Sequence, residues 1–183
     1  MTPAECTARN NARARGENPT LQPHKSQLAL YALGLAGETG EVATALSRLG
    51  GEAELADLRN ELGDVLWYLE RMTRAALGAT LDMLPSWSWT SATQLRHLDA
   101  KQLSRTVGAV CELIKKHLFH DRPLDALEMH VGLDDVLRSL IHLAHFRGRC
   151  TIADLMAINT AKLDARHPNG WDPSYHAKEP HNG

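Results

Sequence analysis

The strongest constraint in the sequence is a set of four acidic residues arranged as two pairs in otherwise apolar stretches, Glu38/Glu41 and Glu61/Asp64. Each pair has a spacing of three residues, which on a helix places both carboxylates on one face about one turn apart. A carboxylate on an apolar helix face is costly unless a cation or hydrogen-bond donors compensate its charge. If the two helices pack through these faces, four carboxylates converge into an all-oxygen site that suits Mg²⁺ or Mn²⁺.

The rest of the chain is also patterned for helices. Apolar residues recur at intervals of three and four, and few β-branched residues alternate with the period of two that indicates a strand. Helices are expected over residues 21–46, 55–77, 99–119, 124–144 and 152–165. The pair Gly50-Gly51 should end the first helix, Gly78 should end the second, and Thr80 should cap the next segment of the chain. The sequence therefore predicts an all-α fold.

Size and composition narrow the class of protein. A chain of 183 residues is long enough for one ordinary core, and its net charge of −2 gives no basic field for nucleic acid. No apolar run has the length of a membrane span, and the N-terminus lacks the apolar core of a signal peptide. The three cysteines form no C-x-x-C motif, which favours reduced thiols. We expect a cytoplasmic protein with no nucleic-acid or membrane partner.

The second half of the chain echoes the first. Residues 61–69 align with residues 132–140, with identity at five of nine positions. In this register Glu38 falls on Ala109 and Glu61 on Gly132. Only Glu41 and Asp64 therefore have acidic counterparts in the second half, Glu112 and Asp135. Lys115 lies three residues from Glu112 and can pair with it. We interpret this as a tandem of an intact and a degenerate helical repeat, the alternative being chance similarity between leucine-rich helices.

The two acidic stretches resemble the motifs of the MazG-like, all-α nucleoside triphosphate pyrophosphohydrolases, in which E-x-x-E is followed by E-x-x-D. The contexts GL-x-GE-x-GEV over residues 34–42 and ELGD-x-LWYL over residues 61–69 match as well. A stretch with the pattern N-x-x-K-L-x-x-R, residues 159–166, is similar to a further family segment. The resemblance spans about Tyr31 to Pro168 and implies a MazG-like helical bundle. Because family members commonly form dimers or tetramers, we also expect a homo-oligomer.

Composition, the internal repeat and this resemblance together suggest a division of the chain. Residues 1–20 would be a flexible arm, 21–84 the catalytic MazG-like half, 85–98 a connector, 99–167 the degenerate half that completes the bundle, and 168–183 a tail.

The resemblance also implies a reaction, the Mg²⁺-dependent conversion of a (d)NTP and water to a (d)NMP and diphosphate. Glu38, Glu41, Glu61 and Asp64 would hold Mg²⁺, for which Mn²⁺ could substitute. Either Glu38 or Glu41 would activate the attacking water, and the sequence does not choose between them. A deoxynucleotide such as dUTP or dGTP is the expected substrate, in pool cleansing or phage nucleotide-pool remodelling.

Other residues are candidate substrate contacts. Lys162, Arg166, Asn159 and Arg48 are predicted to bind phosphate, although Lys162 and Arg166 could instead favour the helix dipole and Arg48 could be a surface residue. The segment ahead of the first acidic helix lines the base pocket in the family. His24, Lys25 and Gln27 of that segment are therefore predicted to contact the base. Trp67 and Tyr68, next to the acids, could stack on it, and one of the two is expected to be a core residue.

Three other interpretations stay open. The chain could be a phosphoribosyl-ATP pyrophosphohydrolase-like enzyme, from which the Leu-Trp-Tyr context leans away. It could also be a non-catalytic helical nucleotide-binding or interaction module, against which the retention of all four acids argues. The ten histidines, with the spaced pairs His117/His120 and His142/His145, raise the possibility of zinc, but no usual zinc spacing is present.

Overall fold

The computed structural model describes residues 23–88, 99–120 and 122–168. These residues form helices α2 (Pro23–Arg48), α3 (Glu52–Leu77), α4 (Ala100–Phe119), α5 (Ala126–Phe146) and α6 (Ile152–Arg166), and two short 3₁₀ helices, η1 (Leu81–Met83) and η2 (Pro85–Ser88). The described residues contain no strand. The all-α prediction is confirmed, and each α-helix begins and ends within three residues of its expected bounds.

Some predicted segments lie outside the described residues. These are the N-terminal arm (1–20), the tail after residue 168, and residues 89–98 of the predicted connector. The start of that connector, Pro85–Ser88, forms η2. Within the part of the chain that the structure describes, no helix is both long and apolar enough to span a membrane.

The helix ends obey the local signals in the sequence. Gly78 ends α3 in the left-handed conformation, with φ of 63°, a backbone that glycine adopts without the steric penalty of a Cβ. Thr80 occupies the cap position of η1 as predicted, but its hydroxyl donates to the Asp82 carboxylate rather than accepting from the backbone. At the start of α6, Thr151 and Asp154 form a reciprocal capping box.

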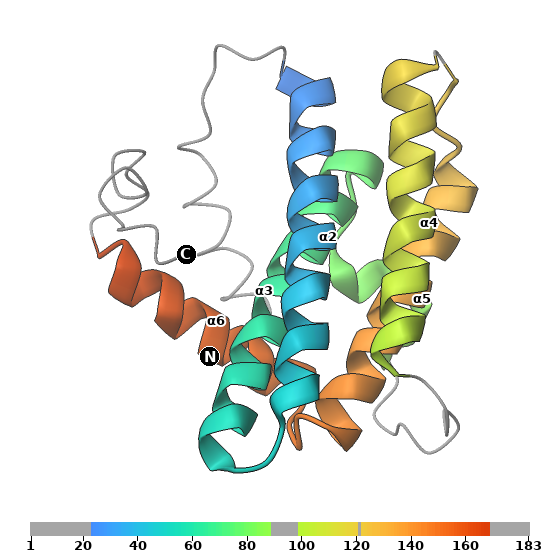
Figure 1. Ribbon diagram of the computed structural model, residues 1–183. Helices are drawn as coiled ribbons and strands as arrows, with labels where there is room; N and C mark the ends of the chain where they lie inside the picture. The colour runs from blue at the N-terminus through green and yellow to red at the C-terminus, as the bar shows by residue number, and fades with distance from the viewer. Residues whose placement is uncertain (1–22, 89–98, 121, 169–183) are drawn as a thin grey trace.

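The first four α-helices form a bundle in which each has two neighbours. α2 packs against α3 and α4, and α5 packs against the same two helices (Figure 1). Every helix buries an apolar stripe between these neighbours, which is how an amphipathic helix removes its apolar face from water. The largest side chains at the centre of this core are almost all leucines, including Leu35, Leu58, Leu62, Leu69, Leu133 and Leu137.

Helix α6 lies outside this ring and crosses α3 (Figure 1). The crossing is close because Gly63 of α3 has no side chain: a Cβ there would lie 3.2 Å from the Cβ of Asn159. The turn before α6 is held by Arg59, whose Nε donates to the carbonyl of Gly148 at 2.7 Å. α6 is therefore fixed against α3 at the level of the second acidic pair.

Candidate metal centre

Three of the four predicted acids converge between α2 and α3. One oxygen each of Glu38, Glu61 and Asp64 lies within 4.8 Å of the others, and all three side chains are partly buried. The pairing arises because α2 and α3 are joined by a short loop and run antiparallel, so that their acidic faces meet. Among the described residues, no other group of three or more acidic, histidine or cysteine side chains lies close enough together to hold a metal ion.

Crowding of these carboxylates perturbs their proton affinity. Burial, followed by the charges of Asp64, Glu41 and Glu61, raises the pKa of Glu38 from 4.5 to about 7. Burial also raises the pKa of Glu61, an effect that the charge of Lys162 opposes. Near neutral pH the cluster therefore lacks the positive charge needed to keep all its carboxylates ionised.

Glu41 lies next to the cluster rather than inside it. Its side chain is exposed, and its oxygens are not part of the tight group. Its negative charge nevertheless contributes to the raised pKa values of both Glu38 and Glu61. Three residues along a helix correspond to a rotation of about 300°, which leaves Glu41 turned by about 60° from the direction of Glu38.

Helix α6 supplies the nearest donors to this cluster. Asn159 Nδ2 donates to Asp64 Oδ1 at 2.6 Å, and the ammonium group of Lys162 contacts Asp64 Oδ2. Both residues are separated from Asp64 by more than 90 positions in the sequence, 95 for Asn159 and 98 for Lys162. Each oxygen of the Asp64 carboxylate thus has its own partner on α6.

The donor set fits a divalent cation. Three carboxylates within a few ångströms offer the hard oxygen ligands that Mg²⁺ and Mn²⁺ prefer. The raised pKa of Glu38 and the ammonium group of Lys162 on Asp64 both indicate a place where positive charge is favourable. The residues therefore match the cofactor expected from the sequence.

Tyr68 is a neighbour of the acids that the sequence offered, together with Trp67, as an aromatic side chain able to stack on a base. Its ring lies over Gly34, where a Cβ would be 2.1 Å from Tyr68 Cε1, so only glycine leaves room for it. Burial, and then the charges of Glu38, Asp64 and Glu41, raise the pKa of the Tyr68 phenol. The sequence signal for this position is spacing. Tyr68 comes four residues after Asp64, and Gly34 comes four before Glu38, so each lies on the same helix face as its acid.

The other predicted phosphate contacts differ in position. Arg166 is exposed one turn beyond Lys162 on α6. Arg48 is exposed at the last turn of α2, ten residues and thus about 15 Å along the helix from Glu38. The structure brings Lys162 and Asn159 to the acids and leaves Arg48 at a distance.

The predicted base contacts lie towards the N-terminal end of α2 and next to it on α3. His24 and Lys25 are exposed there, and Gln27 is partly buried. Trp67 is partly buried, with its ring 6.4 Å from that of Tyr31 and 4.9 Å from that of Tyr68 in edge-on contacts. Arg71 lies over the Trp67 ring at 5.7 Å. Trp67 is thus the one of these residues that packs beside the acidic face.

In the second half, the acids that correspond to the cluster are paired with cations. Glu112 forms ion pairs with Lys115, as predicted, and with Lys116. Asp135 pairs with Arg138 at 3.2 Å. Ala109 is exposed and contributes no carboxylate.

The two histidine pairs that raised the zinc question have other neighbours. His117 Nδ1 is 2.9 Å from the carbonyl oxygen of Arg122, and the ring of His142 stacks at 4.6 Å on Phe146.

Comparison with known protein families agrees with this geometry. The family model of the MazG nucleotide pyrophosphohydrolase domain matches residues 26–81. This stretch contains α2, α3 and all four predicted acids, and it covers less than half of the chain. No curated protein and no solved structure matched the chain in the same comparisons.

The chain therefore carries a MazG-like domain, and the resemblance drawn from its two acidic motifs is confirmed. The matched domain family implies a nucleotide pyrophosphohydrolase, which is a hydrolase, and members of that family typically depend on divalent metal ions.

Proposed function

We propose that the protein is a Mg²⁺-dependent nucleoside triphosphate pyrophosphohydrolase that converts a (d)NTP and water to a (d)NMP and diphosphate. The observation that carries this proposal is the convergence of Glu38, Glu61 and Asp64 with Lys162 placed on the Asp64 carboxylate. A site that hydrolyses a triphosphate needs anionic ligands for a cation and a cationic side chain for the phosphates, and this cluster combines both.

The carboxylates take different roles in this proposal. Glu38, Glu61 and Asp64 would hold the cation, with Glu41 completing the acidic face. When bound, the cation supplies positive charge for the triphosphate and lowers the pKa of the attacking water. Because Glu41 is exposed and outside the tight group, we assign to it the positioning and deprotonation of that water. Glu38 is protonated below about pH 7 without a cation, so occupation of the site is coupled to release of its proton.

Lys162 would act at two stages. Without a cation it neutralises Asp64, and once the site is occupied its ammonium group is free to contact a phosphate oxygen. Arg166, one turn further along α6, would extend this phosphate contact. Asn159 keeps Asp64 oriented through its 2.6 Å hydrogen bond. Phosphate binding by Arg48, base contacts by His24, Lys25, Gln27 and Trp67, and the choice of a deoxynucleotide remain predictions.

The second half would serve as a scaffold that replaces a partner subunit. The bundle supports this proposal because α4 and α5 have the same neighbour relations as α2 and α3, which is the pattern expected of a tandem repeat. Its remaining acids, Glu112 and Asp135, are already neutralised by lysine and arginine, so they offer little to a cation. A homo-oligomer of such two-repeat chains remains our prediction.

Product analysis tests the proposed reaction. The protein is incubated with Mg²⁺ or Mn²⁺ and a panel of canonical and modified ribo- and deoxyribonucleoside triphosphates. Monophosphate plus diphosphate supports the proposal, whereas nucleoside diphosphate plus phosphate contradicts its regiochemistry. Turnover of phosphoribosyl-ATP alone would support the related pyrophosphohydrolase, and no turnover at all would favour a binding module.

Matched variants connect the activity to the site. Glu61→Gln and Asp64→Asn are each expected to lower kcat/KM by about a hundredfold or more, because each removes a charge from the cation site. Glu112→Gln makes the same chemical change in the second half and is expected to leave kcat/KM nearly unchanged. Equal losses in Glu61→Gln and Glu112→Gln would show that the second half is not a scaffold.

A further inference from the structure

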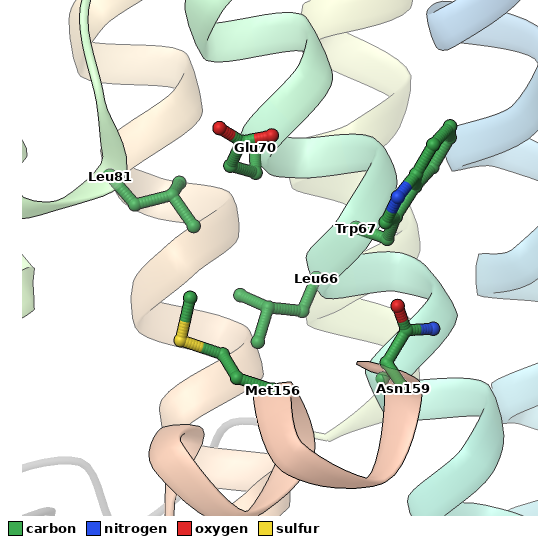
Figure 2. Close-up of a pocket in the computed structure, with 7 residues that line it drawn as sticks. Leu66, Trp67, Glu70, Leu81, Met156 and Asn159 are labelled. Carbon is green, nitrogen blue, oxygen red and sulfur yellow. The ribbon is translucent and has the colours of Figure 1, made fainter. Parts of the chain in front are cut away.

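A small cavity lies beside the acidic cluster, on the side of Asn159 away from α2. It is lined by residues of α3, η1 and α6, with Leu66, Leu81 and Met156 as its apolar lining and Trp67, Glu70 and Asn159 as its polar lining (Figure 2). It has room for about one water molecule. Asn159 therefore stands between this cavity and Asp64.

Two polar atoms on the cavity wall are buried and have no hydrogen-bond partner among the described residues. They are the indole Nε1 of Trp67 and the amide oxygen Oδ1 of Asn159. In Figure 2 the amide oxygen of Asn159 points towards the indole ring of Trp67, with a gap between the two groups. Leaving a buried donor or acceptor without a partner costs about 1–3 kcal/mol each, so such atoms in one cavity call for a shared partner.

Glu70 also lines this cavity, but its carboxylate already has partners. Its side chain is only 2% exposed, and its two oxygens accept from Arg71 Nε at 2.9 Å and from Arg74 at 3.1 and 3.3 Å. Among the described residues, the cavity wall thus presents one unpartnered donor, on Trp67, and one unpartnered acceptor, on Asn159.

We infer that this cavity binds a single structural water that accepts from Trp67 Nε1 and donates to Asn159 Oδ1. A water molecule has protons to donate and lone pairs to accept, which matches one donor and one acceptor. An ammonium ion could only donate and would repel the indole N–H. Neither the volume nor the polar lining suits a larger ligand.

This water makes Trp67 a positioning residue for the metal centre. The indole nitrogen can only donate, so the water it holds presents a proton to Asn159 and keeps the amide oxygen in the cavity. The amide nitrogen is then turned towards Asp64, where it donates at 2.6 Å. A flipped amide would place its oxygen against the Asp64 carboxylate. Trp67 thus acts on Asp64 through the water and Asn159.

The effect of Trp67 on metal binding rests on the proposed function. The water itself does not, because it is inferred from the buried polar atoms of the cavity. It also differs from the base contact predicted for Trp67 from the sequence. A base contact uses the aromatic face, whereas the water uses the indole N–H. The substitution Trp67→Phe separates them, because phenylalanine keeps an aromatic face and lacks the N–H.

The first test measures Mn²⁺ affinity by titration calorimetry without nucleotide. Trp67→Phe is expected to weaken Mn²⁺ binding about three- to tenfold, somewhat less than loss of a group that contacts a metal ligand directly. Trp87→Phe, the same change on η2 at a residue that does not line the cavity, is the matched control and should bind Mn²⁺ like the wild type. An unchanged Mn²⁺ affinity in Trp67→Phe would overturn the inference.

A double-mutant cycle separates a link through Asn159 from a general packing effect. If Trp67 acts through Asn159, adding Trp67→Phe to Asn159→Leu should cause almost no further loss of Mn²⁺ affinity. Additive losses would contradict the inference, since they would show that Trp67 acts independently of the amide.

A high-resolution crystal structure of the wild-type protein tests the water directly. The expected result is one ordered water within hydrogen-bond distance of Trp67 Nε1 and Asn159 Oδ1, and a cavity with no ordered water would overturn the inference. If the wild type binds no Mn²⁺, the proposed function fails, and this structure still decides whether the water is present.

Discussion

Replacing Glu38 with glutamine should stabilise the metal-free protein at neutral and alkaline pH. The pKa of Glu38 is about 7 in the folded chain, against 4.5 for the ordinary side chain, mainly because of burial and then because of neighbouring carboxylates. A carboxyl group with a raised folded-state pKa contributes stability below pH 4.5 and loses it as the pH rises towards 7. Glutamine resembles the protonated form at every pH and removes this loss.

The magnitude depends on the size of the pKa difference. Because a tenfold change in proton affinity is worth about 1.4 kcal/mol, the full difference corresponds to roughly 3 kcal/mol. The Glu38 side chain is only partly buried, so solvent screening reduces the expected gain to about 1–2 kcal/mol above pH 7. For a chain of this size, that gain corresponds to a rise in Tm of roughly 3–6 °C.

The assay is thermal or urea unfolding in the presence of EDTA at several values between pH 5 and 8. The wild type should lose stability relative to Glu38→Gln across this range, and the two should converge near pH 5. Glu112→Gln is the control, because Glu112 is only partly buried and is paired with lysines, and it should not become more stable at high pH. Lower stability of Glu38→Gln at pH 8, or a pH dependence parallel to that of the wild type, would refute the electrostatic reasoning.

Three further substitutions test other parts of the structure. Lys162→Met should tighten Mn²⁺ binding about five- to tenfold in calorimetry, because it removes the cation that pairs with Asp64. It should also lower kcat by about a hundredfold or more through loss of a phosphate contact. Weaker Mn²⁺ binding would contradict the idea that Lys162 and the metal ion compete for Asp64. Gly34→Ala should cost about 1–3 kcal/mol of unfolding free energy in urea, because its Cβ would collide with the ring of Tyr68; unchanged stability would show that the ring moves freely. Asp134→Asn should also cost about 1–3 kcal/mol of unfolding free energy, because Asp134 accepts the hydrogen bonds that hold η2 on α5. Its Mn²⁺ affinity should be unaffected, and a large change in that affinity would link η2 to the metal centre.

Local chemistry made the helices and the acidic faces predictable from the sequence. A helix repeats every 3.6 residues, so the apolar pattern, with glycines as stop signals, placed α2 to α6 within three residues of their observed ends. Gly78 was recognisable as a helix end because only glycine adopts its left-handed backbone without strain. The two acidic pairs were likewise recognisable, since carboxylates on apolar faces need a counter-charge.

Tertiary structure decided how those pieces combine. Spacing placed Glu38 and Glu41 on one face, but the rotation of α2 against α3 selected Glu38 for the tight group and left Glu41 exposed. The partners of Asp64, Asn159 and Lys162, lie more than 90 residues away on a helix whose approach depends on a glycine in α3. Periodicity within one helix carries no information about which distant helix packs on it, so these contacts, and the buried indole nitrogen of Trp67, emerged only from the folded chain.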